Sequence, residues 1–287
     1  MLPTFKPLTL LLLGLIAISQ SLMGQSYLGG VYQRTDVRFD ESKFTLYQFS
    51  RKKGKVKAKY FAQNANREFQ RWKQRKNILF YCSGAFSENW SSSSPPLGIC
   101  VDNGVIVNRK IDNEMDGLVI VYNGGAQQGG IAVINLEKEK VNVTQGGKYT
   151  FDLRSYKDRT SFLNWARDQG ATVFQTQLMY TKSYGYAFPK DKMTHGKKAE
   201  RRFLAICKKG NTVVHLVINF PESSYLNAAA DKVVRYLKKQ RFEVFGLFNL
   251  DTGGKDIMKA YDGQGHGIDS GSTSLNQATN LLVYYVD

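Results

Sequence analysis

The run of residues 242–250 restricts the fold more than any other segment, because it is too apolar and aromatic for a solvated loop. Such a run predicts a strand buried in a β-sheet. Asp251 follows directly, and Gly253 and Gly254 lie in the turn after it. A carboxylate at the end of a buried strand is costly without a partner, and the glycines let the backbone come close to whatever the carboxylate serves. The segment indicates either a site at Asp251 or an aspartate that caps the turn, and alone it favours the cap.

The rest of the chain alternates short apolar stretches with turns, which is typical of antiparallel strands. Residues 27–61 alternate apolar and polar positions. Residues 97–107 predict a hairpin with Asp-Asn-Gly at its turn, and residues 203–220 predict a second hairpin. We expect the final strand over residues 280–286. The sheet is therefore predicted to be extensive.

Helices are expected in three places. They are the basic segment 63–76, a segment that begins at Thr160, and a longer segment that Ser223 or Ser224 caps. With the strands, they predict an α+β fold in which a mixed, largely antiparallel sheet is flanked by a few helices. No repeat or linker divides residues 25–287, so we expect one domain.

The N-terminus has the pattern of a signal peptide. One charge, Lys6, precedes an apolar run from Leu8 to Ile18, and a small residue, Gly24, follows a polar stretch. The apolar run is shorter than the roughly 20 residues that span a bilayer. We therefore predict a signal peptide over residues 1–24 and export to the bacterial periplasm or the extracellular space. An uncleaved anchor is the alternative; no second long apolar stretch predicts a transmembrane segment in the mature chain.

The charge of the chain is strongly positive. Loss of Lys6 with the signal peptide lowers the net charge by one, from +16 to +15. Such an excess predicts anionic partners, which outside the cytoplasm means phosphate-linked glycans, lipid head groups or other acidic envelope polymers. Nucleic acid ranks low, because the chain has no recognised binding motif and export removes it from the usual target. The alternation of lysines over residues 55–59 predicts an edge strand protected by charge.

Cysteine and histidine usage gives little sign of a metal site. Cys82, Cys100 and Cys207 allow one disulfide at most, between Cys82 and Cys100, and three isolated buried thiols are the equal alternative. No cysteine or histidine pair has zinc-ligand spacing. His215 lies in an apolar strand pattern and is predicted to be a core histidine with satisfied hydrogen bonds. No cofactor is evident, although a carboxylate near a phosphate leaves a bound divalent cation open.

Five landmarks follow one another from Ile78 to the C-terminus. They are a strand ending in Ser83-Gly84, a hairpin with Pro96, Gly98 and Gly104, a strand containing Gln177, a strand led by Arg201 or Arg202 before Gly210, and the segment Leu250-Asp251-Thr252-Gly253-Gly254-Lys255. In this order they resemble the phosphodiester glycosidase family, the N-acetylglucosamine-1-phosphodiester alpha-N-acetylglucosaminidase-like domains. The resemblance places such a domain over residues 25–287 and is strongest over residues 78–287.

The resemblance implies hydrolysis of a glycosyl-phosphodiester bond, with release of a sugar from a phosphate. Phosphate is a good leaving group, and a cation beside it stabilises the developing charge. Arg201 would be that cation, and Asp251 would act as base or stabilise the cationic sugar. The remaining residues implied in substrate binding are Ser83, Gly84, Gln177, Gly253, Gly254 and Lys255. The alternative for Arg201 is one more solvated charge in a basic run.

Two departures from the family pattern keep a second function open. Thr252 replaces a glycine of the family's last motif, and Lys255 replaces its serine. Lys255 would either bind phosphate or block a site that no longer turns over. A second carboxylate is not assigned among Glu88, Asp116 and Asp256. The alternative function is therefore a catalytically inactive module that binds anionic glycans or phospholipid head groups, and a structural envelope protein is a third.

Overall fold

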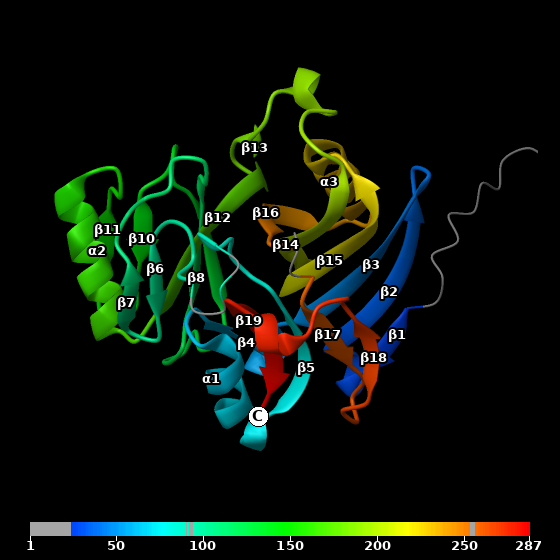
Figure 1. Cartoon of the computed structure of the whole chain (residues 1–287), viewed down its shortest axis with the longest axis horizontal. Coiled ribbons are helices and arrows are strands. Elements are labelled where there is room, and N and C mark those ends of the chain that lie inside the picture. The colour runs from blue at the N-terminus through cyan, green and yellow to red at the C-terminus, as the bar shows by residue number, and fades with distance from the viewer. Residues whose placement is uncertain (1–23, 90, 92–93, 253–255) are drawn as a thin grey trace, which may run out of the picture.

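The computed structural model describes residues 24–89, 91, 94–252 and 256–287 (Figure 1). The predicted signal peptide therefore lies outside the described residues, except for Gly24. One twelve-stranded sheet dominates the fold. Along its main path, the order of its strands is β1 (Gln25–Tyr27), β2 (Tyr32–Phe39), β3 (Ser42–Ser50), β15 (Thr212–Ser224), β14 (Ala199–Lys209), β16 (Glu243–Leu250), β12 (Thr172–Thr181), β6 (Cys100–Asp102) and β7 (Val105–Asn108).

Three further strands belong to the large sheet, and two smaller sheets complete the fold. The further strands are β8 (Gly117–Val121), β9 (Ile131–Asn135) and β13 (Gly185–Tyr186). A five-stranded sheet has the order β18 (Gly267–Ser270), β17 (Met258–Tyr261), β5 (Asn77–Cys82), β19 (Leu281–Val286) and β4 (Lys57–Phe61). A two-stranded sheet pairs β10 (Val141–Val143) with β11 (Tyr149–Phe151). Every strand pairing of the described residues is antiparallel, and with three α-helices the α+β prediction is confirmed.

The three helices cover different parts of the sheets. They are α1 (Ala65–Trp72), α2 (Tyr156–Asp168) and α3 (Leu226–Lys239). Figure 1 shows α2 beside β7 and β11 and α3 against β14, β15 and β16. Among the described residues, no helix is both long and apolar enough to cross a membrane.

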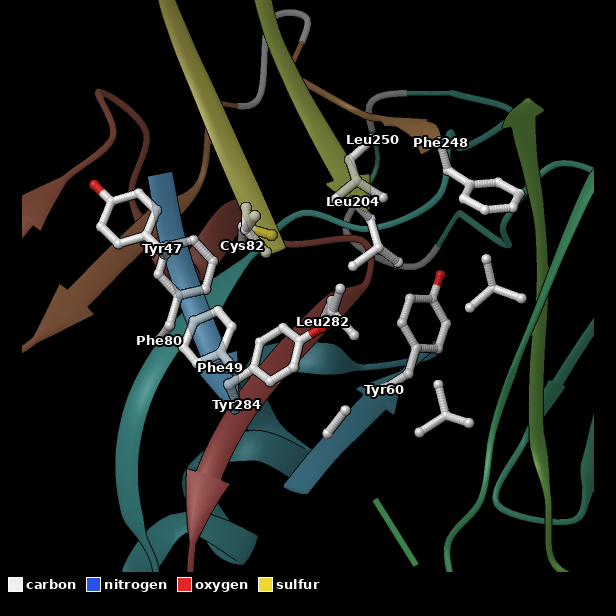
Figure 2. Close-up of a cluster of buried hydrophobic side chains, with 14 of the residues drawn as sticks. Tyr47, Phe49, Tyr60, Phe80, Cys82, Leu204, Phe248, Leu250, Leu282 and Tyr284 are labelled. Atoms are coloured by element: carbon white, nitrogen blue, oxygen red, sulfur yellow. The ribbon is translucent and has the colours of Figure 1, made fainter. Parts of the chain in front are cut away.

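The main core lies between the large sheet and the five-stranded sheet. Figure 2 shows Phe49, Phe80 and Tyr284 gathered there, and the rings of Phe49 and Tyr284 stack at 3.9 Å between centroids. The opposite face of the large sheet packs against α3 through a second cluster that includes Phe203 and Val233. The large sheet is thus covered on both faces around β14 and β16. This explains why residues 243–250 lack a continuous polar face.

Several element boundaries differ from the sequence prediction. Helix α2 begins at Tyr156 and not at Thr160, because the side chain of Ser155 accepts a hydrogen bond from the backbone N–H of Asp158 and caps the helix. Neither Ser223 nor Ser224 caps α3, since both belong to β15. The apolar contacts of the helix with the sheet compensate for the missing cap.

The lysine-rich segment is an edge strand, as predicted. Strand β4 pairs only with β19 and ends the five-stranded sheet. The hairpin of β6 and β7 is also confirmed, with Asn103 at φ 48° and Gly104 at φ 82° in its turn. Strands β17 and β18 lie in a polar, glycine-containing region for which the sequence indicated no strand.

The three cysteines are free and buried, which decides between the two alternatives that the sequence left open. Burial raises the pKa of the Cys82 thiol to about 12, although the charge of Arg202 acts in the opposite direction. Burial also raises the pKa of the other two thiols. The three side chains therefore act as small apolar core residues.

Candidate active site

The candidate site begins where β16 ends, at the junction of the two larger sheets. The backbone N–H of Asp251 donates to the carbonyl oxygen of Gly84 at 2.9 Å. Ser83 and Gly84 directly follow β5 of the five-stranded sheet, whereas Asp251 follows β16 of the large sheet. The fold therefore brings the first and last landmarks of the sequence together.

The strand register places Arg201 beside Asp251. Arg202 pairs with Leu250 across β14 and β16, so one step further along this register sets Arg201 opposite Asp251. The hydroxyl of Thr252 donates to the carbonyl of Glu200 at 3.0 Å, which shows that the two segments remain adjacent past this point. Residues opposite each other in antiparallel strands have Cβ atoms roughly 5 Å apart and share a face of the sheet. The backbone thus brings the segment that carries Arg201 next to the segment that carries Asp251.

Two nitrogens of the Arg201 guanidinium donate hydrogen bonds to backbone carbonyls. Its Nε donates to the carbonyl of Ser224 at 3.1 Å, and Nη2 donates to the carbonyl of Lys197. The side chain is half-buried, and this burial lowers its pKa. Arg201 is therefore held in place by backbone carbonyls, unlike the solvated charge that was the alternative.

Gln177 belongs to β12, which pairs with the other edge of β16, and it lies on the same face of the large sheet as Arg201. It pairs in register with Asn249, and the Nδ2 of Asn249 donates to the Oε1 of Gln177 at 2.8 Å. Asn249 is buried, and its Oδ1 has no hydrogen-bond partner among the described residues. Asn249 lies two residues before Asp251 in the chain, so the pair of Gln177 and Asn249 lies close to the candidate site. Sequence reasoning missed Asn249, although a polar residue inside an apolar run was the available signal.

Arg202 forms a buried anchor on the opposite face of the same strand. Its side chain is 0% exposed, and Nη2 donates to Asp256 Oδ1 at 2.5 Å and to Asn219 Oδ1 at 3.0 Å. Asp256 also accepts from the backbone N–H of Ser272 at 2.9 Å. Burial raises the pKa of Asp256, but the charge of Arg202 and the hydrogen bonds to the carboxylate outweigh it, so the pKa lies below its usual range. The pair therefore fixes Asp256 against the strand β14.

The turn at Gly84 is fixed by Asn280, which sequence reasoning also missed as a site residue. Asn280 is fully buried; its Oδ1 accepts from the N–H of Gly84 at 3.0 Å, and its Nδ2 donates to the carbonyl of Ala85 at 2.8 Å. The N–H of Ser83 donates to the carbonyl of Ile257 at 3.0 Å. Both backbone amides are thus engaged within the protein, and the two residues shape the turn. The weak signal for Asn280 was an amide at the start of an apolar strand.

The remaining predicted residues lie in different settings. Gly253, Gly254 and Lys255 lie outside the described residues. Asp116 accepts from the backbone N–H of Leu178 at 3.1 Å, and burial raises its pKa. Of the three carboxylates left open as a second acid or base, Asp256 is the one that contacts the strand carrying Arg201.

No metal centre is evident in the part of the chain that the structure describes. That part contains no group of three or more histidine, cysteine, aspartate or glutamate side chains placed to hold a metal ion.

Comparison with known proteins supports a likeness of fold. No family model matches the chain, and no curated protein sequence does. Among solved structures, the chain is similar to the zebrafish N-acetylglucosamine-1-phosphodiester alpha-N-acetylglucosaminidase catalytic domain auto-inhibited by its pro-peptide, with a TM-score of 0.52. The two share a fold. At 11% sequence identity, the match covers 92% of this chain and 87% of that chain.

A second solved structure, a hypothetical protein from Synechocystis, is similar at a TM-score of 0.44 and 11% identity, covering 89% of this chain and 62% of that one. The resemblance predicted from the sequence is thus confirmed at the level of a distant structural relationship.

Proposed function

We propose that this chain is an exported hydrolase that cleaves a glycosyl-phosphodiester bond and releases sugar from a phosphate-linked glycan. One observation carries the proposal: β14 and β16 pair up to Arg202 and Leu250, so Arg201 and Asp251 are the next residues of two adjacent segments, and the backbone N–H of Asp251 donates to the carbonyl of Gly84. The fold shared with the catalytic domain of a phosphodiester glycosidase supports the same reading.

In the proposed reaction, Asp251 and Arg201 have different roles. Asp251 acts on the sugar, as base or as the charge that stabilises a cationic anomeric carbon. Arg201 stabilises the negative charge that develops on the leaving phosphate. Nη1 is the guanidinium nitrogen of Arg201 for which no hydrogen bond to the described residues is found. That nitrogen is the one we assign to the phosphate.

Other residues in the proposal position these two. Gln177 would contact the sugar, and the buried Asn249 would hold the amide of Gln177 in place. Arg202 is too deeply buried to touch the sugar and acts through Asp256. Gly253, Gly254 and Lys255 keep their proposed role in substrate binding, and a divalent cation beside the phosphate remains part of the proposal. The substrate is a phosphate-linked glycan or a related anionic envelope polymer in the periplasm or outside the cell.

The test is release of reducing sugar from a panel of glycosyl-phosphodiesters by the purified mature chain, with and without divalent cations. Asp251→Asn should lower kcat by about 100-fold or more, and Arg201→Gln should lower kcat/KM by a similar factor. Asp168→Asn and Arg167→Gln are matched controls, because these two residues form an exposed ion pair in α2. Release that persists undiminished in Asp251→Asn would remove this residue from the mechanism.

The second candidate function is a non-catalytic module for anionic glycans or phospholipid head groups. The net charge of +16 favours it, as do the Ser83 and Gly84 amides that are already engaged. Isothermal titration with the same phosphodiesters separates the two functions. Binding without release of sugar supports the module.

A further inference from the structure

A cavity of about 740 Å³ opens at the end of the large sheet remote from the candidate active site. His215 on β15 and the turn between β14 and β15 line one side of it. Asn219, which bonds to Arg202 near the candidate active site, lies four residues further along β15. Four residues of a strand span about 13 Å. The cavity is therefore a separate place on the molecule.

The cavity has positive charge without a matching negative charge. Arg51 and Lys52 line it, and among the described residues no acidic side chain does. The guanidinium of Arg51 is partly buried and donates to the carbonyls of Val56 and, at 3.0 Å, Gln128. Within the described residues Arg51 forms no ion pair, and burial lowers its pKa. A partly buried cation of this kind gains from a bound anion, because carbonyl dipoles balance only part of its charge.

His215 closes one side of the cavity, and its ring packs against the buried ring of Tyr284. His215 is 1% exposed, and its Nδ1 is enclosed without a hydrogen-bond partner in the described chain. The prediction of a core histidine with satisfied bonds is therefore wrong in its second half. Burial, with a smaller contribution from the charge of Arg51, lowers the pKa of His215 to about 3, so the ring is neutral at pH 7. The enclosed, neutral ring adds no charge to the cavity, so the positive charge there comes from Arg51 and Lys52.

The other polar groups in the cavity are neutral amides and hydroxyls. They come from Gln127, Asn142, Thr144, Asn211 and Thr212. Such side chains donate to and accept from hydroxyl groups, and their number exceeds what a bare phosphate ion requires. The cavity volume falls within the range of about 300–1,000 Å³ found for small-molecule sites.

We propose that this cavity binds an anionic saccharide, with the phosphate or carboxylate at Arg51 and the sugar hydroxyls at the neutral amides and hydroxyls of the lining. A saccharide bound in this cavity leaves the candidate active site at the end of β16 unoccupied, so both sites can bind glycan groups at the same time. It goes beyond the proposed hydrolase, and it holds equally for a protein without catalysis.

Isothermal titration of the intact mature chain tests the proposal with four probes: glucose 6-phosphate, glucuronate, glucose and inorganic phosphate. Both charged sugars should bind at least about tenfold more tightly than glucose, and glucose 6-phosphate more tightly than inorganic phosphate. Gln127→Glu places a negative charge at the rim of the cavity and should weaken the charged sugars about tenfold, with the larger effect at low salt. Gln264→Glu makes the same change at an exposed residue that does not line the cavity and should leave binding unchanged.

Two comparisons separate this site from the candidate active site. Asp251→Asn should retain binding of the charged sugars at the cavity, even where it abolishes release of sugar. Arg51→Gln should lose the preference for charged over neutral sugar, with circular dichroism to check that the variant is folded. Equal binding of glucose and glucose 6-phosphate overturns the proposal, and so does equal binding of inorganic phosphate. The proposal is also overturned if the charged sugars still bind to the Gln127→Glu variant but no longer bind to the Asp251→Asn variant.

Discussion

Replacing Asp256 by asparagine should destabilise the fold, because it leaves the fully buried guanidinium of Arg202 without its counter-ion. Removal of one partner from a buried ion pair costs about 3–5 kcal/mol. Asp256 is 15% exposed and asparagine fills the same volume, so we expect the lower end, about 3 kcal/mol. Asn219 and the carbonyl of Ile257 still accept from Arg202 but carry no full charge.

Urea denaturation followed by circular dichroism at pH 7 measures the effect. With an m value of about 3 kcal/mol per molar for a chain of this size, the midpoint should fall by about 1 M. Asp168→Asn is the matched control, since its partner Arg167 is exposed and the pair contributes less than about 1 kcal/mol. If the urea midpoint falls no further for Asp256→Asn than for the control, Arg202 does not depend on this carboxylate. The ion pair would then not be a structural anchor.

The same variant has a pH dependence with a defined sign. The pKa of Asp256 is lowered in the folded chain, because the charge of Arg202 and the hydrogen bonds from Arg202 and Ser272 outweigh the effect of burial. Stability from a carboxylate of lowered pKa is present above the unfolded pKa of about 3.9 and is lost as the pH falls through the folded pKa. The difference between wild type and Asp256→Asn should therefore narrow between about pH 5 and pH 3. A difference that widens on acidification contradicts the assigned sign.

Three further outcomes follow from the buried groups. Gly84→Ala should cost about 1–3 kcal/mol in urea denaturation, because its Cβ would lie 2.5 Å from Cε2 of the buried Tyr60 ring; an unchanged midpoint would mean that the turn relaxes freely. His215→Leu should flatten the loss of stability between about pH 6.5 and pH 3, since the folded pKa of about 3 makes the unfolded chain bind more protons in this range; an unaltered pH profile would rule out His215 as the cause. The three buried thiols should resist iodoacetamide at pH 8 in the folded chain and react in denaturant, as mass spectrometry would show, whereas rapid modification of the native chain would contradict their burial.

Most of the strands could be predicted from the sequence, because their apolar patterns are local. The run that ends at Leu250 is strand β16, and the alternating segment near the N-terminus forms β2 and β3. Short strands in polar regions were missed, since β17 owes its position to pairing with β5 and not to its own composition. The start of α2 was misplaced because Tyr156 and its neighbours lack the apolar spacing that marks the rest of the helix.

The candidate site was only partly within reach of the sequence. Asp251 stood out because a charge ended an apolar run, and its bond to Gly84 links residues far apart in the chain. Arg202 was named only as the alternative to Arg201, and Asn280 gave only a weak signal. The burial of both side chains was not predictable, because a polar side chain deep in a core is stabilised by distant partners that the local sequence does not show.

The neighbouring arginines Arg201 and Arg202 show why a motif alone could not divide the roles at this site. Successive residues of a strand point to opposite faces, so the two guanidinium groups enter different layers of the protein. Arg202 enters the core and binds Asp256, whereas Arg201 lies opposite Asp251 in the register of β14 and β16. A shift of one residue in that register would exchange the buried anchor and the proposed phosphate-binding cation. The two substitutions should therefore have different effects. Arg201→Gln should lower the turnover rate with nearly unchanged stability, whereas Asp256→Asn should mainly lower the free energy of unfolding.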